Sequence, residues 1–286
     1  MPFYRAYDDA ELAYRELGDP ASPPLVCLAG GPGRDAAYLG DLGGLDRTYR
    51  LIVPDARGTG DSPLPSDPGR YAFPSLAEDV ESLREHLGLD RIAILAHDAA
   101  AATAQAYAAS HPLRTGRLVL VAPGARLQGA LPEDARRIFD ARRGEAWWPD
   151  AAAAVEELAR TTDFAAARAL LPRVAPMAYG TWGPAQRAHA EAEPGQIRPV
   201  PRAGFWQGVD DHARIALLER VREAHCPALV VTGEHDAVAG IRSGELVAET
   251  FPGGDVLLMS GVGHYPWVDD PDAFADAVHA FLTGRL

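Results

Sequence analysis

The sequence contains little cysteine, no lysine and no cluster of basic residues. Its two cysteines, Cys27 and Cys226, lie in or beside predicted core strands, so we expect two buried reduced thiols. No histidines and cysteines have the spacing of a zinc site, and we therefore expect no metal and no other cofactor. A net charge of −13 without a basic cluster argues against nucleic acid and anionic membranes as partners.

Long apolar runs are also absent. No segment is long enough to span a bilayer, and the N-terminus lacks the charged and apolar regions of a signal peptide, so we expect a cytoplasmic protein. All 27 basic residues are arginine and alanine is abundant, which indicates a GC-rich bacterial genome. Nothing in the sequence marks a subunit interface.

Apolar runs alternate with helical patterns along most of the 286 residues, of which 47% are hydrophobic. This alternation predicts an α/β fold in which helices cover both faces of a parallel sheet. Helices are expected over 75–87 and 272–282, and ligands at the carboxyl ends of the strands. The runs expected to form buried strands are 25–29, 51–54, 91–96, 117–122, 228–232 and 255–259.

The alternation stops between residues 126 and 211, which we expect to form a helical cap inserted into a core of residues 1–125 and 212–286. The cap carries four of the five tryptophans, whose rings can line an apolar pocket or fill the cap's own core. These are Trp147, Trp148, Trp182 and Trp206. Cap helices are expected over 132–143, 150–160, 164–171 and 184–193, followed by a proline-rich connection through Pro194, Pro199 and Pro201.

Asp98 lies between an apolar run over 91–95 and an alanine-rich helical stretch that ends near 110–112. A strand, a sharp turn and a helix present a nucleophile well, and this position usually carries serine. A serine attacks carbonyl carbon, whereas a carboxylate is suited to displacing a leaving group from saturated carbon, which forms an ester on the enzyme. Asp98 therefore predicts a different chemistry from that of a serine hydrolase.

Two further residues complete a catalytic triad with Asp98. Asp236 follows one predicted strand and His264 follows the last one. We expect Asp98 to attack, His264 to activate the water that hydrolyses the ester, and Asp236 to orient the imidazole and stabilise its charged form.

A glycine-rich turn after the first predicted core strand, over 30–33, could approach a substrate closely with its backbone. We expect the Gly31 and Ala99 N–H groups to form an oxyanion hole. Nucleophile turns need small residues two positions before and after the nucleophile, and here these are Ala96 and Ala100.

Several motifs resemble the α/β-hydrolase superfamily, in the branch similar to prolyl-iminopeptidase-like hydrolases. They are Gly30-Gly31-Pro32-Gly33, the segment 55–62, Gly233-Glu234-His235-Asp236 and Gly263-His264-Tyr265-Pro266-Trp267. The order nucleophile, acid, histidine also agrees with this fold. The resemblance implies that segment 55–62 braces the active-site loops.

The sequence departs from that branch at two positions. Ala29 replaces the family's histidine before the glycine-rich turn, and Asp98 replaces its serine. Attack of a carboxylate on an amide would give an unfavourable anhydride, which argues against a peptidase. Epoxide hydrolases and haloalkane dehalogenases of the superfamily carry Asp at this position, typically followed by tryptophan, whereas Ala99 follows here. This difference weakens dehalogenation more than epoxide opening.

Hydrolysis of an epoxide on a small apolar molecule is therefore the expected function. Resembling enzymes use cap tyrosines to protonate the departing oxygen, and Tyr179 is the cap candidate. His189 and Trp182 are alternative donors, and Tyr265 could also face the cavity.

Two alternatives stay open. One is a dehalogenase, in which Trp148 or Trp182 would supply indole N–H groups to the halide. The other is a protein that binds or remodels a ligand without hydrolysis, as Ala29 and the elbow without glycine suggest; the retention of Asp236 and His264 argues against it.

Overall fold

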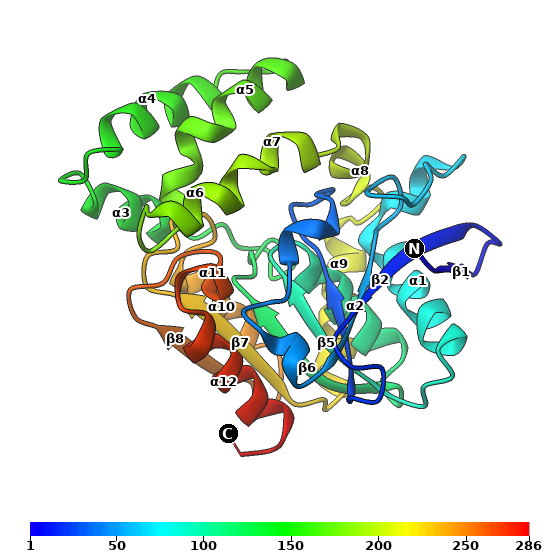
Figure 1. Ribbon diagram of the computed structural model, residues 1–286. Coiled ribbons are helices and arrows are strands. Elements are labelled where there is room, and N and C mark those ends of the chain that lie inside the picture. The colour runs from blue at the N-terminus through cyan, green and yellow to red at the C-terminus, as the bar shows by residue number, and fades with distance from the viewer. Residues whose placement is uncertain (286) are drawn as a thin grey trace.

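The computed structural model describes residues 1–285, and within them eight strands form one sheet in the order β1-β2-β4-β3-β5-β6-β7-β8 (Figure 1). The six strands from β4 to β8 are parallel, and β2 joins β4 and β1 antiparallel. The strands are β1 (Phe3–Arg5), β2 (Glu11–Leu17), β3 (Pro24–Leu28), β4 (Arg50–Pro54), β5 (Ile92–His97), β6 (Thr115–Val121), β7 (Ala228–Gly233) and β8 (Asp255–Met259).

All six predicted core strands are confirmed, with bounds that differ by two residues or fewer. The antiparallel pair β1 and β2 was not expected. In β2 the charged residues Glu11, Arg15 and Glu16 interrupt the apolar run, so the sequence pattern does not predict a buried strand there.

Helices cover both faces of the sheet, as predicted. The core cluster on one face includes residues of α1, α2, α9 and α10, and that on the other includes α12. The helices are α1 (Phe73–His86), α2 (Ala100–Ser110), α3 (Asp134–Ala141), α4 (Trp148–Leu158), α5 (Phe164–Val174), α6 (Pro184–Glu191), α7 (Glu193–Gln196), α8 (Pro199–Gly204), α9 (Asp211–Glu223), α10 (Ile241–Ala248), α11 (Pro266–Asp269) and α12 (Pro271–Leu282).

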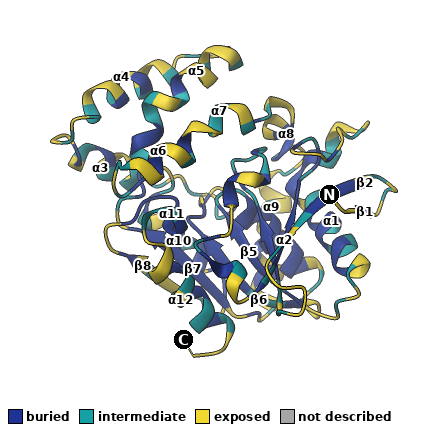
Figure 2. Ribbon diagram, in the orientation of Figure 1, coloured by how far each residue is buried: buried dark blue, intermediate teal, exposed yellow. Residues whose placement is uncertain are grey.

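The alanine-rich composition of α2 follows from its place in the fold. This helix packs against β5, α1 and α9, and every residue from Ala100 to Ala109 is buried. Alanine combines high helix propensity with a small side chain, so it allows the neighbouring elements to approach from several sides. The dark central elements in Figure 2 show this burial, whereas the outer helices α4 and α5 are partly exposed.

The segment expected to form the cap contains α3 to α8. In Figure 1, α4 and α5 are the outermost helices, and α6 and α7 lie between them and the sheet. The expected proline-rich connection is wrong, because α7 and α8 occupy it. Pro194 and Pro199 lie in the first turns of these helices, where a backbone N–H has no intrahelical acceptor and proline is tolerated.

Segment 55–62 forms a turn in which Asp55, Arg57 and Ser62 are buried. Asp55 accepts the Asp61 N–H at 3.1 Å, and the Ser62 hydroxyl donates to the Asp55 carbonyl at 2.7 Å. Arg57 pairs with Asp79 at 2.6 Å and with Asp8 at 2.8 Å. These contacts support the structural role expected for this segment.

The two cysteines are free and buried, as predicted. Among residues 1–285, no helix is long and apolar enough to cross a bilayer.

Replacement of Arg57 by leucine would leave the buried Asp79 carboxylate without its partner. We expect the free energy of unfolding to fall by about 3–5 kcal/mol, because an uncompensated charge then remains in the core. Urea denaturation followed by circular dichroism measures this change. Arg70→Leu removes a more exposed guanidinium that lies 3.6 Å from Asp8, and it should leave stability close to wild type. An equal loss in both variants would contradict a specific role for the buried pair.

Candidate active site

The turn between β5 and α2 holds Asp98 in a left-handed backbone conformation. Its φ angle is 50°, which is uncommon for residues other than glycine but is adopted most readily by Asp and Asn. The Asp98 N–H donates to the Val121 carbonyl of the neighbouring strand β6 at 2.9 Å. Ala96 and Ala100 on either side are buried, so their small side chains allow the close packing that this turn requires.

The glycine-rich turn after β3 packs directly on this elbow. A Cβ atom on Gly30 would lie 2.3 Å from the His97 carbonyl oxygen and 2.9 Å from Asp98 Cβ, so only glycine fits. The Gly31 N–H donates to Asp98 Oδ2 at 2.9 Å. Ala99 precedes the first residue of α2, where backbone donors have no intrahelical acceptor. The two expected oxyanion-hole donors therefore belong to the segments that meet at Asp98.

The loops after β7 and β8 bring Asp236 and His264 together. Both are buried, and His264 Nδ1 lies 3.0 Å from Asp236 Oδ2. Asp236 Oδ1 accepts the N–H groups of Val238 and Ala239 at 2.8 and 2.9 Å. A carboxylate only accepts, so His264 Nδ1 carries a hydrogen and Nε2 is the basic nitrogen of the neutral ring.

Burial and Asp236 act on His264 in opposite directions. Burial disfavours the imidazolium, but the charge and hydrogen bond of the Asp236 carboxylate, with the charges of Asp98 and Glu193, hold the pKa of His264 above its ordinary value. The ring is thus a stronger base than a free imidazole, as the removal of a proton from water requires.

A cavity of about 490 Å³ lies between these strand ends and the cap, and both Asp98 and His264 line it. Its cap wall is largely apolar and includes Leu158 of α4 and Phe164 and Leu171 of α5. Its polar part is formed by Gly31, Arg34, Tyr38, His97, Glu193 and Tyr265, with Arg168 and Arg202. The cavity thus joins a reactive floor to an apolar wall.

Tyr179 does not line this cavity, which contradicts its expected role as the cap acid. Its side chain is 1% exposed, and its hydroxyl lies 2.7 Å from His189 Nδ1. His189 Nε2 lies 2.9 Å from the Tyr38 carbonyl and must donate to it, so Nδ1 accepts the Tyr179 proton. Burial lowers the pKa of His189 to about 4, so the ring is neutral and neither residue has a proton to offer a substrate.

The expected tryptophan contacts are also wrong, because neither Trp148 nor Trp182 lines the cavity. Trp148 stacks on Phe139 and its indole N–H donates to the Phe139 carbonyl at 2.9 Å. Trp182 packs on Tyr179, with its ring under the Arg187 guanidinium. Both indole rings therefore pack against other residues of the cap and do not reach the cavity.

His97 is a cavity residue that the sequence motifs do not reveal. It ends β5, and its ring lies 4.6 Å from that of His264, centroid to centroid. Its Nε2 lies 3.0 Å from the His264 carbonyl oxygen. Burial, reinforced by the neighbouring His264, holds the pKa of His97 well below its ordinary value, so the ring is neutral. A polar residue at the end of an otherwise apolar strand was the signal that could have identified it.

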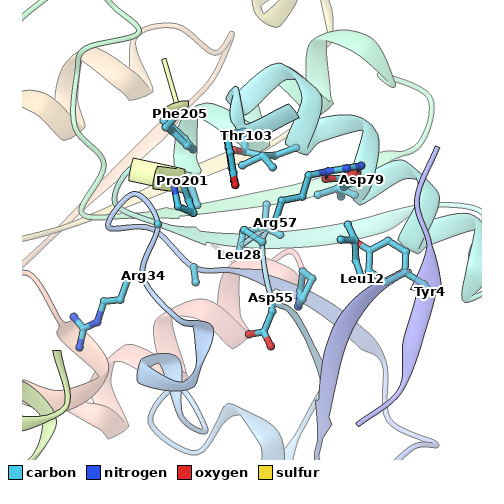
Figure 3. Close-up of a pocket in the computed structure, with 18 residues that line it drawn as sticks. Tyr4, Leu12, Leu28, Arg34, Asp55, Arg57, Asp79, Thr103, Pro201 and Phe205 are labelled. Atoms are coloured by element: carbon cyan, nitrogen blue, oxygen red, sulfur yellow. Dashed lines mark hydrogen bonds and ion pairs between the residues drawn. The ribbon is translucent and has the colours of Figure 1, made fainter. Parts of the chain in front are cut away.

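A second cavity, of about 50 Å³, lies beside the glycine-rich turn, with Leu28, Ala29 and Gly33 in its wall, and is too small for a substrate. Figure 3 shows Arg57 facing Asp79 at this cavity, whereas the Arg34 side chain points away from them. In the part of the chain that the structure describes, no three His, Cys, Asp or Glu side chains form a group that could hold a metal ion.

Residues 23–271 match the family described as alpha/beta hydrolase fold. The chain belongs to this α/β-hydrolase family. A proline iminopeptidase from Xylella fastidiosa (strain Temecula1) is 26% identical to this α/β-hydrolase over 317 residues, covering 96% of this chain and 94% of that protein. The family inferred from the motifs is therefore confirmed, and an iminopeptidase relative agrees with the branch.

The names of other similar proteins specify different activities. The esterase RhEst1 from Rhodococcus sp. ECU1013 has a TM-score of 0.76 at 25% identity, covering 99% of this chain and 98% of that one. A cis-3-alkyl-4-alkyloxetan-2-one decarboxylase from Shewanella oneidensis is 34% identical over 130 residues, which is 44% of this chain and 40% of that protein. The comparisons support a hydrolase on this fold and a small-molecule substrate.

The substitution Asp236→Asn tests the electrostatic coupling in the active site of this α/β-hydrolase. We expect the pKa of His264 to fall, because burial then acts on the ring without the opposing carboxylate. An NMR titration of the His264 ring measures the change, and Asp272→Asn on the exposed surface of α12 is the matched control. An unchanged His264 titration in Asp236→Asn would contradict the coupling.

Proposed function

We propose that this α/β-hydrolase opens an epoxide on a small, largely apolar molecule, with Asp98 as the nucleophile. The observation that carries the proposal is the carboxylate at the nucleophile elbow, with Oδ2 held by the Gly31 N–H at 2.9 Å. The opposite oxygen, Oδ1, has no hydrogen-bond partner among residues 1–285 and remains the attacking atom.

The first step is attack of Asp98 Oδ1 on a saturated ring carbon. A C–O bond forms to the enzyme, the ring C–O bond breaks, and the electron pair goes to the ring oxygen. Oδ2 becomes the carbonyl oxygen of the resulting ester and is already next to the Gly31 N–H. The same donor therefore faces the negative charge that develops on this oxygen when water attacks the ester.

The second step is hydrolysis of this ester. His264 removes a proton from water, the hydroxide attacks the ester carbonyl carbon, and the diol departs with regeneration of the Asp98 carboxylate. Asp236 stabilises the imidazolium formed on His264. The 3.0 Å contact between Asp236 and His264 also weighs against a protein that only binds ligands, since binding requires no such base.

The cavity favours an epoxide over a haloalkane. The two indoles that were expected to donate to a departing halide, those of Trp148 and Trp182, do not line the cavity. The apolar wall from α4 and α5 suits a hydrocarbon substituent on the ring.

A four-membered lactone is the second candidate substrate. It is favoured by the similarity to the decarboxylase whose name specifies an oxetan-2-one. Attack of Asp98 on the saturated ring carbon would again form an alkyl ester, but it would release a carboxylate instead of an alkoxide.

The variant His264→Ala should accumulate the ester, because attack by Asp98 survives and water activation does not. We expect turnover to fall by about 10⁴-fold and an adduct on Asp98 with the full mass of the epoxide. Intact-protein mass spectrometry and peptide mapping after exposure to a panel of epoxides, haloalkanes and four-membered lactones detect it. A haloalkane adduct would lack the elements of hydrogen halide.

Asp98→Asn is the matched control and should form no adduct and show no turnover, once deamidation has been excluded by mass. Undiminished turnover in this variant would remove Asp98 from the mechanism. A folded His264→Ala protein that never forms an adduct would count against the covalent route.

A further inference from the structure

Ring opening leaves negative charge on the epoxide oxygen, and this oxygen needs a proton donor in the cavity. Tyr179, the expected donor, does not line the cavity. Two other tyrosines, Tyr38 and Tyr265, do. The hydrogen bonds of the two hydroxyl groups show which of them still has a hydrogen that it can donate to a substrate.

The Tyr38 proton is already engaged. His97 Nε2 faces the His264 carbonyl oxygen, which only accepts, so the hydrogen of the neutral His97 ring is on Nε2. His97 Nδ1 is then an acceptor, and the Tyr38 hydroxyl donates to it at 2.7 Å. The Tyr38 oxygen also accepts the Gly30 N–H at 2.9 Å. The Tyr38 hydroxyl therefore links the glycine-rich turn to the end of β5, and its hydrogen is not available to a substrate.

The Tyr265 proton is free. The Tyr265 oxygen accepts a hydrogen bond from Arg34 Nη1 at 2.8 Å, and a guanidinium can only donate. The bond thus uses a lone pair of the oxygen and leaves the hydroxyl hydrogen available. Within residues 1–285 this hydroxyl has no acceptor. Both Tyr265 and its hydrogen-bond partner Arg34 line the cavity, together with Asp98 and His264.

Arg34 is placed to stabilise negative charge on Tyr265. Its side chain is 2% exposed, its Nε donates to Gln196 at 3.0 Å, and its guanidinium carbon lies 4.1 Å from the centroid of the Tyr38 ring. In the described part of the chain, Arg34 Nη2 is buried without a hydrogen-bond partner. Arg34 Nη1 also lies 3.8 Å from the Glu193 carboxylate. A positive charge with one unused donor, partly balanced by Glu193, is thus fixed beside the Tyr265 oxygen.

We propose that Tyr265 is the catalytic acid of ring opening and that Arg34 stabilises the phenolate it leaves; this rests on the proposed function. As the ring C–O bond breaks, the ring oxygen takes the Tyr265 hydrogen and becomes a hydroxyl group. The O–H electron pair stays on Tyr265 as a phenolate facing Arg34. Charge is conserved, because the Asp98 carboxylate has become a neutral ester.

The hydrolytic half of the cycle restores the proton. His264 gains one from water when the ester is hydrolysed, and Tyr265 lacks one. The proton balance therefore requires the proton on His264 to return to Tyr265, whose ring is a neighbour with its centroid 5.1 Å away. The sum of the two halves is epoxide plus water giving diol.

Burial also favours a neutral Tyr265 in the resting enzyme. It raises the pKa of Tyr265 well above its ordinary value, and the Glu193 charge acts in the same direction, whereas the Arg34 charge acts in the opposite one. The hydroxyl therefore keeps its proton at neutral pH and yields it only to a strong base, such as the alkoxide formed in ring opening.

The test compares electrophiles that do and do not need an acid. In a His264→Ala background, the rate of ester formation is followed by mass spectrometry with styrene oxide and with (2-bromoethyl)benzene, and again with 1,2-epoxyoctane and 1-bromooctane. Bromide leaves without a proton, so it reports nucleophile and binding alone. We expect Tyr265→Phe to slow the epoxides by about 10²-fold or more and to leave the bromides within a few-fold.

Tyr179→Phe is the matched control, since it removes a buried hydroxyl outside the cavity, and it should not alter the ratio of epoxide to bromide rates. Arg34→Met should slow the epoxides selectively, as Tyr265→Phe does. Equal slowing of epoxides and bromides by Tyr265→Phe would overturn the acid role, and so would unchanged epoxide rates. If His264→Ala alone forms no ester with any of the four probes, the proposed function fails and this assignment with it.

Discussion

The site depends on the close approach of two backbone turns. Gly30 packs against the carbonyl of His97 and the Cβ of Asp98 with no room for a side chain, and this contact brings the Gly31 N–H onto the carboxylate. Asp98 itself stays at a positive φ angle. The turn needs small neighbouring residues and a central residue that can adopt a strained backbone conformation. Because β3 and β5 are adjacent parallel strands, the turns that follow them lie side by side.

Around this contact, two neutral histidines fix the supporting hydrogen bonds. His97 donates to the His264 carbonyl and accepts from Tyr38, and His189 donates to the Tyr38 carbonyl and accepts from Tyr179. In each ring one nitrogen donates a hydrogen bond and the other accepts one, so the tautomer and the orientation of the ring are determined. Burial keeps both rings uncharged and preserves the pattern at neutral pH. The network links the cap, the glycine-rich turn and the end of β5.

The cap and the sheet contribute different properties to the cavity. Helices α4 and α5 provide an apolar wall, whereas the loops after the strands provide the charged and hydrogen-bonding groups. Arg34 connects the two parts, since it contacts Tyr265 of the core and Gln196 and Glu193 of the cap. An apolar wall lowers the local polarity and thereby strengthens electrostatic interactions on the cavity floor.

The sequence by itself determined the fold, six parallel strands and the meeting of Asp98, Asp236 and His264, because the carboxyl ends of neighbouring parallel strands share one edge. It could not determine which side chains of the cap face the cavity. Tyr179 and Trp182 lie between α5 and α6, and Trp148 begins α4. All three side chains point elsewhere because tertiary packing, which no local sequence pattern encodes, sets their orientation. The interrupted strand β2 was missed for a related reason, since pairing with β4 creates its burial. Only the tertiary structure decided that Tyr265, and not Tyr179, has a free proton in the cavity.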